Sequence, residues 1–159
     1  MKSYQILVSS DAGSGAVNDK VYKFDWSILP AGEYEMSFTF MSEPLKTTKA
    51  TAEATQQSMA LEFQSPLSYD AYEVKSNGFA NSTNVVGLLE VDGVDGIWDD
   101  ATADFSMRHW KSKNDNPSIN LYGKPQGNEF RVRLLKTNGV LAIHHPTKYD
   151  MIIKLKHIC

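Results

Sequence analysis

The feature that most constrains this chain is an alternation of apolar and polar residues with a period of two. Tyr34, Met36, Phe38 and Phe40 are separated by single polar residues. Successive side chains of a strand point to opposite faces, so this spacing predicts a strand with one buried face. Similar alternation covers 22–28, 59–63, 130–134 and 149–158.

Turn-forming residues separate most of these segments. The segment Pro30–Gly32 follows the first aromatic run, which predicts either a hairpin or a connection between sheets. Asn138-Gly139 is the strongest hairpin dipeptide in the chain. The apolar run 85–91 is typical of a strand buried on both faces, and 46–57 indicates an extended loop or an edge strand.

These patterns predict an all-β chain in which about eight antiparallel strands form a jelly-roll β-sandwich. We expect one domain over 1–159, because the sequence contains no linker and no internal repeat. Hydrophobic residues at 42% and charged residues at 22% exclude a disordered chain. An immunoglobulin domain with its internal disulfide is excluded, because Cys159 is the only cysteine.

The sequence also predicts where the protein is made. The first apolar run, residues 6–8, is shorter than the core of a signal peptide, so we expect synthesis in the cytosol. No stretch reaches the roughly 18–20 apolar residues of a membrane span.

Six acidic residues and no basic residue lie between Glu90 and Asp104. Two Asp-Gly pairs predict a loop here, and carboxylates on a loop are the ligands that calcium prefers. The alternative is a solvated loop without metal. The candidate calcium ligands are Asp92, Asp95, Asp99 and Asp100.

Charge is distributed unevenly along the chain. Residues 105–159 contain ten Lys and Arg against three acids, a charge of +7, which leaves −10 for the rest of a chain of net charge −3. We favour solvent-facing strand positions over a basic sheet face that binds an acidic partner or nucleic acid. Opposite poles also suit assembly of copies. The candidate interface residues are Asp92, Asp95, Trp98, Arg131, Arg133, Lys154 and Lys156.

No motif for catalysis stands out. The loop with Gly13 and Gly15 lacks the Lys-Ser/Thr of a phosphate loop, and His144 and His145 are adjacent, which is poor geometry for one metal ion in a strand. The sequence has no nucleophile elbow. We therefore expect no enzyme, no catalytic residue and no cofactor.

Three segments resemble small single jelly-roll capsid proteins of large DNA viruses of algae and protists. The first is Lys20–Phe40, an aromatic–acid–Trp unit followed by Leu-x-x-Gly-x-Tyr and alternating Phe. The second is Asn116–Leu135, where a Pro-bearing loop precedes an alternating strand, and the third is the closing segment Tyr149–Lys156. The chain departs from penton proteins of this kind because it is too short for an insertion domain.

The resemblance implies a viral structural protein: a minor capsid, cement or penton-like subunit that contacts other capsid subunits. It further implies a homo-oligomer, a pentamer or trimer, located in the virion after synthesis in the host cytoplasm. The alternative function is a carbohydrate- or ligand-binding β-sandwich with an exposed Trp98 or Trp110 and calcium at the acidic segment. A metal-dependent enzyme of the cupin type is a third, less supported alternative.

Overall fold

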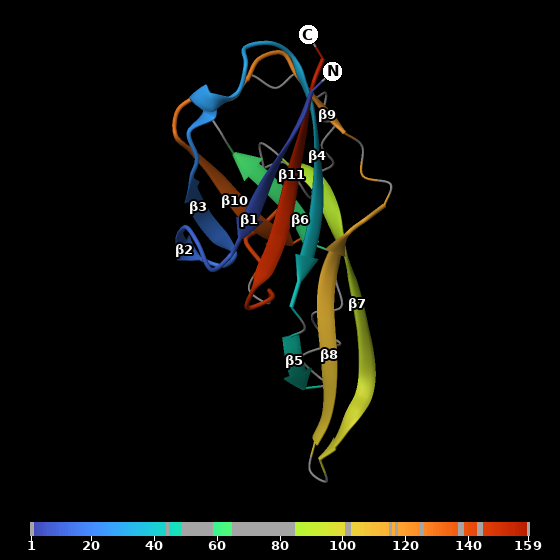
Figure 1. Cartoon of the computed structure of the whole chain (residues 1–159). Coiled ribbons are helices and arrows are strands. Elements are labelled where there is room, and N and C mark those ends of the chain that lie inside the picture. The colour runs from blue at the N-terminus through green and yellow to red at the C-terminus, as the bar shows by residue number, and fades with distance from the viewer. Residues whose placement is uncertain are drawn as a thin grey trace.

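A computed structural model of the chain gives an all-β protein (Figure 1). It describes residues 2–43, 45–48, 59–64, 85–100, 103–114, 116, 118–124, 126–136, 139–142 and 145–158, with the backbone alone for 45–48, 92–100 and 103–108. In this part of the chain no helix is long and apolar enough to cross a membrane.

The described strands form one curled antiparallel sheet. Nine strands follow one another in the order β1-β11-β4-β8-β7-β6-β10-β3-β2, while β5 pairs with β8 and β9 pairs with β4. The strands are β1 Ser3–Ser9, β2 Ser14–Ala16, β3 Asp19–Lys23, β4 Tyr34–Ser42, β5 Leu45–Thr48, β6 Met59–Gln64, β7 Val85–Asp100, β8 Ala103–Ser112, β9 Ile119–Leu121, β10 Glu129–Lys136 and β11 Tyr149–His157.

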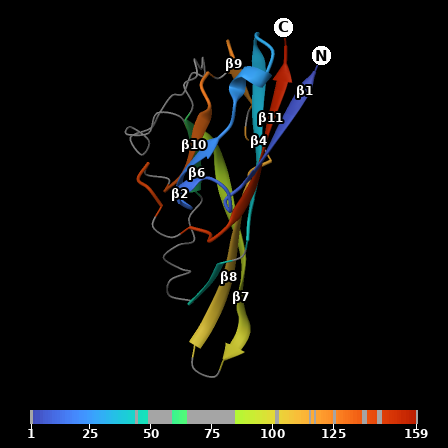
Figure 2. The same ribbon diagram turned by 60° about the vertical axis from the view of Figure 1, so that its left-hand side comes forward.

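Strands from the two ends of the chain pair in a nested order. The first long strand β1 pairs with the last, β11, and β3 pairs with β10. Further inward, β4 pairs with β8 and β6 with β7. We call β1, β11, β4 and β8 the β11 half of the sheet, and β7, β6, β10 and β3 the β10 half; the long β7–β8 hairpin joins them (Figure 2).

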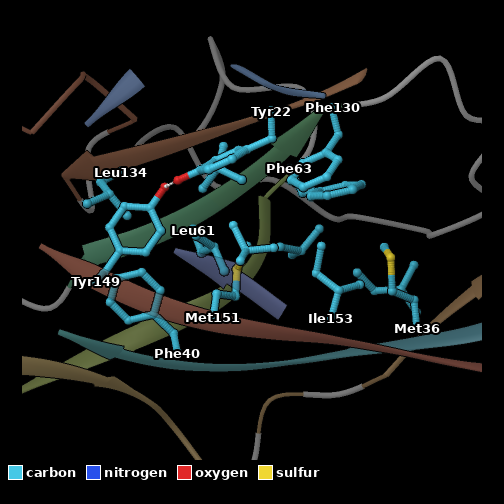
Figure 3. Close-up of a cluster of buried hydrophobic side chains, with 14 of the residues drawn as sticks. Tyr22, Met36, Phe40, Leu61, Phe63, Phe130, Leu134, Tyr149, Met151 and Ile153 are labelled. Atoms are coloured by element: carbon cyan, nitrogen blue, oxygen red, sulfur yellow. Dashed lines mark hydrogen bonds between the residues drawn. The ribbon is translucent and has the colours of Figure 1, made fainter. Parts of the chain in front are cut away.

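Curling of the sheet brings apolar side chains of the two halves into one core (Figure 3). Phe63 of β6 stacks on Phe130 of β10 and meets Phe38 of β4 at 5.5 Å between ring centres. Among the aromatic residues of the alternating segments 22–28 and 34–40, Trp26, Tyr34 and Phe40 are fully buried. Phe24 and Phe38 are partly buried and pack against the same cluster.

One hydrogen bond spans the core between the two halves. The hydroxyl groups of Tyr22 in β3 and Tyr149 in β11 lie 2.6 Å apart, and both side chains are buried (Figure 3). Burial raises the pKa of both phenols, so both stay protonated at neutral pH. The pair satisfies two hydroxyl groups that would otherwise be buried without a partner.

The predicted strand over 22–28 is shorter than the alternation indicates. β3 ends at Lys23, and residues 26–28 form a 3₁₀ turn that exposes Ile28. The Asp25 carboxylate accepts a hydrogen bond from the Ser27 amide at 3.0 Å, which caps this turn and competes with strand geometry. Because β3 and β4 belong to different halves, the Pro30–Gly32 segment connects the halves and is not a hairpin turn.

The prediction of a loop over Glu90–Asp104 is wrong. Residues 85–100 and 103–112 are paired as β7 and β8, with a register shift between Asp95 and Asp99. The two Asp-Gly pairs lie inside β7, so backbone pairing with β8 outweighs their turn preference. The far end of the hairpin extends beyond the other long strands of the sheet (Figures 1 and 2).

Other predicted strands are confirmed. β11 alternates buried and exposed residues over Tyr149–His157, and β10 buries Phe130, Val132 and Leu134 as expected. Residues 45–48 are a short strand paired with β8, in agreement with an edge strand in 46–57; residues 49–57 lie outside the described part. Gly139 has a positive φ of 83°, as the Asn-Gly turn requires, while Asn138 is outside the described residues.

Candidate functional site

The basic residues of β10 are paired within the chain. Arg131 donates two hydrogen bonds to the Asp19 carboxylate, each 2.7 Å long. Arg133 donates two to the Glu62 carboxylate, at 2.5 and 2.9 Å. These fork-to-fork pairs hold both guanidinium groups against the β10 half of the sheet.

The two pairs differ in exposure. The Glu62 side chain is 0% exposed and that of Arg133 is 25% exposed, whereas the Arg131 and Asp19 side chains are 42% and 27% exposed. Gln64 adds a hydrogen bond of 2.7 Å to Glu62. Arg133 is therefore the partner of a buried charge, and its first role is to stabilise this fold.

Lys154 and Lys156 of β11 have a different environment. Both side chains are exposed, and neither forms an ion pair with a described residue. Four strands separate β11 from β10 in the sheet. The basic residues predicted as one interface therefore lie on two separate parts of the sheet, and their role in contacts between subunits stays a prediction.

The acidic candidates lie on the β7–β8 hairpin. Asp92 pairs with His109 and Asp95 with Ser106, while Asp99 and Asp100 pair with Asp104 and Ala103. The side chains of these four aspartates and of Trp98 lie outside the described part, so calcium binding and interface contacts stay predictions. Among the residues whose side chains are described, no group of three or more His, Cys, Asp or Glu could hold a metal ion.

Trp110 is not the exposed aromatic platform that a sugar site would need. Its side chain is 1% exposed and belongs to the core. Its amide donates to the Ser42 hydroxyl at 2.8 Å, which ties β8 to β4. The sugar-stacking hypothesis therefore retains Trp98 as its aromatic residue.

Between β4 and β8 the sheet is nearly open. Met41 and Lys111 are the one residue pair in the described β4–β8 ladder. Beyond it, the Phe40 amide donates to the Ser112 hydroxyl at 3.2 Å, so a side chain replaces a backbone partner. This divergence of two strands leaves a pocket of about 290 Å³.

Both apolar and polar residues line the pocket. The apolar lining includes Phe38, Leu61, Val86 and Leu89. Polar lining comes from both strands and from the segment after β8. These residues are Ser37, Thr39, Ser112, Lys113, Asn114 and Asn116.

Asn116 shapes the pocket at β7. Its side-chain amide accepts a hydrogen bond from the Leu88 amide at 3.0 Å and donates to the Leu88 carbonyl at 2.8 Å, as a neighbouring strand would. A Cβ at Gly87 would lie 2.9 Å from Nδ2 of Asn116, so Gly87 leaves room for this contact. Sequence reasoning missed this pair, because nothing in the local pattern links residues 28 positions apart.

Comparisons of the chain with models of protein families, with curated proteins and with solved structures found no match.

Proposed function

We propose that this protein is a jelly-roll subunit of a virus particle, a minor capsid, cement or penton-like protein that works by binding other capsid subunits. It would be made in the host cytoplasm and act in the virion. The observation that carries the proposal is the nested pairing of β1 with β11, β3 with β10, β4 with β8 and β6 with β7.

The nested order supports a jelly roll because of how that fold is built. A long antiparallel hairpin of eight strands pairs its first strand with its last and its innermost strands with each other. Winding that hairpin around a core adds new neighbours, in a pair of Greek keys. The neighbours expected from winding are β11 beside β4 and β6 beside β10, and both pairs are present.

A jelly roll is a common fold of viral capsid subunits, but it also occurs in lectins and cupins. The sequence resemblance of Lys20–Phe40, Asn116–Leu135 and Tyr149–Lys156 to small capsid proteins favours the first of these uses. The exposed lysines of β11 and the acidic hairpin supply opposite charges for contacts between copies.

Light scattering of the purified protein at low and high salt tests the proposal. We expect a trimer or pentamer whose mass falls as salt increases, because complementary charges are screened. The Asp92→Asn/Asp95→Asn variant should assemble less at low salt. The Glu43→Gln/Asp150→Asn variant, which removes two exposed acids elsewhere, is the matched control. A monomer under all conditions, or equal behaviour of both variants, contradicts assembly through the hairpin acids.

The second candidate function is a carbohydrate- or ligand-binding module, and the pocket between β4 and β8 favours it. A pocket lined by apolar side chains together with hydroxyl and amide groups is typical of sites for small polar ligands. Glycan-array binding, with and without calcium, tests this function. A Thr39→Trp variant should abolish binding by filling the pocket, whereas Thr39→Ser should retain it. No binding to any glycan, together with assembly as described above, rejects this candidate.

A further inference from the structure

The strand β1 lies at one end of the sheet order and pairs with β11 alone among the described strands. Figure 2 shows it at the outer side of the sheet. An edge strand offers unpaired backbone groups to other chains, so proteins commonly protect it with charges, proline, bulges or shortness. β1 has none of these protections. Its sequence Ser-Tyr-Gln-Ile-Leu-Val-Ser is seven residues long, uncharged and free of proline, with an uninterrupted register against β11.

The other described strands at open positions of the sheet differ from β1. β2, at the far end, has three residues that include Gly15. β5 pairs with β8 and β9 pairs with β4, outside the nine-strand order, and they have four and three residues. Short strands make poor templates for pairing. β1 is therefore better suited than β2, β5 or β9 to extend the sheet.

Two backbone hydrogen bonds to β11 fix which residues of β1 face the open edge. The Lys2 carbonyl accepts from His157 at 2.8 Å, and the Ser10 amide donates to Tyr149 at 2.9 Å. Residues of an antiparallel strand alternate between facing the partner and facing away. Since even-numbered positions face β11, the backbone groups of Ser3, Gln5 and Leu7 point outward. The carbonyl of Ser9 accepts from the Ala12 amide at 3.0 Å and is occupied.

We propose that β1 pairs antiparallel with β1 of a second copy of this chain about a two-fold axis at Gln5. In that register Gln5 faces its own counterpart, and Ser3 faces Leu7 of the other copy. All three outward-facing residues of each strand then exchange backbone hydrogen bonds. A two-fold contact does not close a trimer or pentamer, so it would join two such rings to each other. The contact deepens the proposed assembly function, on which it rests, by naming the partner and the strand.

A second copy fits this edge better than an unrelated chain for three reasons. The register pairs the open residues of β1 from Ser3 to Leu7, while the Ser9 carbonyl is already bonded within the chain. The edge has no charge, so two identical strands do not repel each other. The Gln5 amide is both donor and acceptor and therefore complements itself. Pairing also covers Leu7, which is 78% exposed as a monomer.

Cysteine cross-linking tests the register directly. In the Gln5→Cys/Cys159→Ser variant the two Cα atoms would be about 5.5 Å apart, which permits a disulfide. In Leu7→Cys/Cys159→Ser they would be about 14 Å apart or more, given about 3.4 Å for each of four residues. We expect a disulfide-linked dimer from the first variant and not from the second. Equal cross-linking, cross-linking of the second alone, or none in either overturns the proposal.

Light scattering gives an independent measurement. Leu7→Lys places a charge at the exposed edge and should remove the two-fold contact, while circular dichroism and melting temperature stay unchanged. Gln5→Pro should do the same, because the lost amide faces outward. If either folded variant keeps the mass of the parent protein, the edge contact is rejected. Salt-sensitive assembly of unchanged mass in Leu7→Lys would reject the β1 contact and leave the proposed capsid function standing.

Discussion

The basic residues in the two halves of the sheet differ in their ion pairs. In the β10 half, Arg131 and Arg133 each form a two-pronged pair with a carboxylate of the same chain. In the β11 half, Lys154 and Lys156 alternate along the strand in the same way but form no ion pair with a described residue. Two stretches with the same spacing of positive charge thus differ in whether they form ion pairs within the described part of the chain.

The difference indicates which basic residues stabilise the fold and which could bind other molecules. Arginine has a planar group that matches a carboxylate with two hydrogen bonds, whereas lysine is a hydrated point charge. Both arginines form ion pairs within the chain. The exposed lysines form none with a described residue, so they are the better candidates for contacts with other molecules. Assembly through basic residues should therefore depend on β11 and only weakly on β10.

The largest expected effect comes from removing the partner of the buried acid. Arg133→Met leaves Glu62 buried without its counter-ion and should lower the free energy of unfolding by about 3–5 kcal/mol. Arg131→Met, at the more exposed pair, should cost less than about 1 kcal/mol. Urea denaturation of both variants measures the two values.

A double variant separates the loss of the pair from the loss of packing. Arg133→Met/Glu62→Leu removes both charges and should recover most of the stability lost in Arg133→Met. The proposed difference between the two pairs fails if Arg133→Met and Arg131→Met have equal effects.

A smaller effect is expected where the halves meet, at the hydroxyl groups of Tyr22 and Tyr149. Tyr22→Phe or Tyr149→Phe leaves one buried hydroxyl without its partner, which should cost about 1–3 kcal/mol. The double Phe variant should be less destabilised than the sum of the single variants, because no hydroxyl remains unpaired. Thermal melting of the parent protein, the two single variants and the double variant measures the coupling between the two hydroxyl groups. Strictly additive losses of stability would show that the hydrogen bond does not join the halves.

Sequence patterns predicted most of the strands but only part of the site. Alternation identifies β4, β10 and β11. One face of each strand lies against the core, so apolar residues recur at every second position. Alternation fails at residues 26–28, where the Asp25 cap favours a turn, and at β7, where Asp-Gly pairs adopt strand geometry through pairing with β8. Both failures come from interactions that the apolar pattern does not record.

The partners of the arginines lie far from them in the sequence. Asp19 and Glu62 are 112 and 71 residues from Arg131 and Arg133, so the pairs depend on strand order and register. One signal was present: Glu62 is a lone charge within the otherwise apolar run 59–63. A charge in that position predicts a partner, although it does not identify which residue it is.

A pH effect of still smaller size is expected at the exposed arginine pair. Hydrogen bonds from Arg131 hold the pKa of the Asp19 carboxyl below its usual value of 3.8, against the opposing effect of partial burial. The ionised Asp19 carboxylate therefore stabilises the fold above pH 3.8. This contribution is lost as the pH falls through the lowered pKa of the folded state. Arg131→Met should reduce the acid loss of stability by less than about 1 kcal/mol, measured by urea denaturation between pH 5 and 2. An unchanged acid profile would contradict the role of this pair.

The smallest effect on stability, and the most informative for function, is expected at the lysines. Lys154→Ala/Lys156→Ala should leave the free energy of unfolding within about 0.5 kcal/mol of the parent, because both side chains are exposed and unpaired with described residues. The same variant should lower the mass of the assembly at low salt and weaken its salt dependence. Arg131→Met, which removes one positive charge from the β10 half, is the control and should keep both properties. If Arg131→Met weakens assembly as much as the lysine variant, the division between arginines for folding and lysines for contact is wrong.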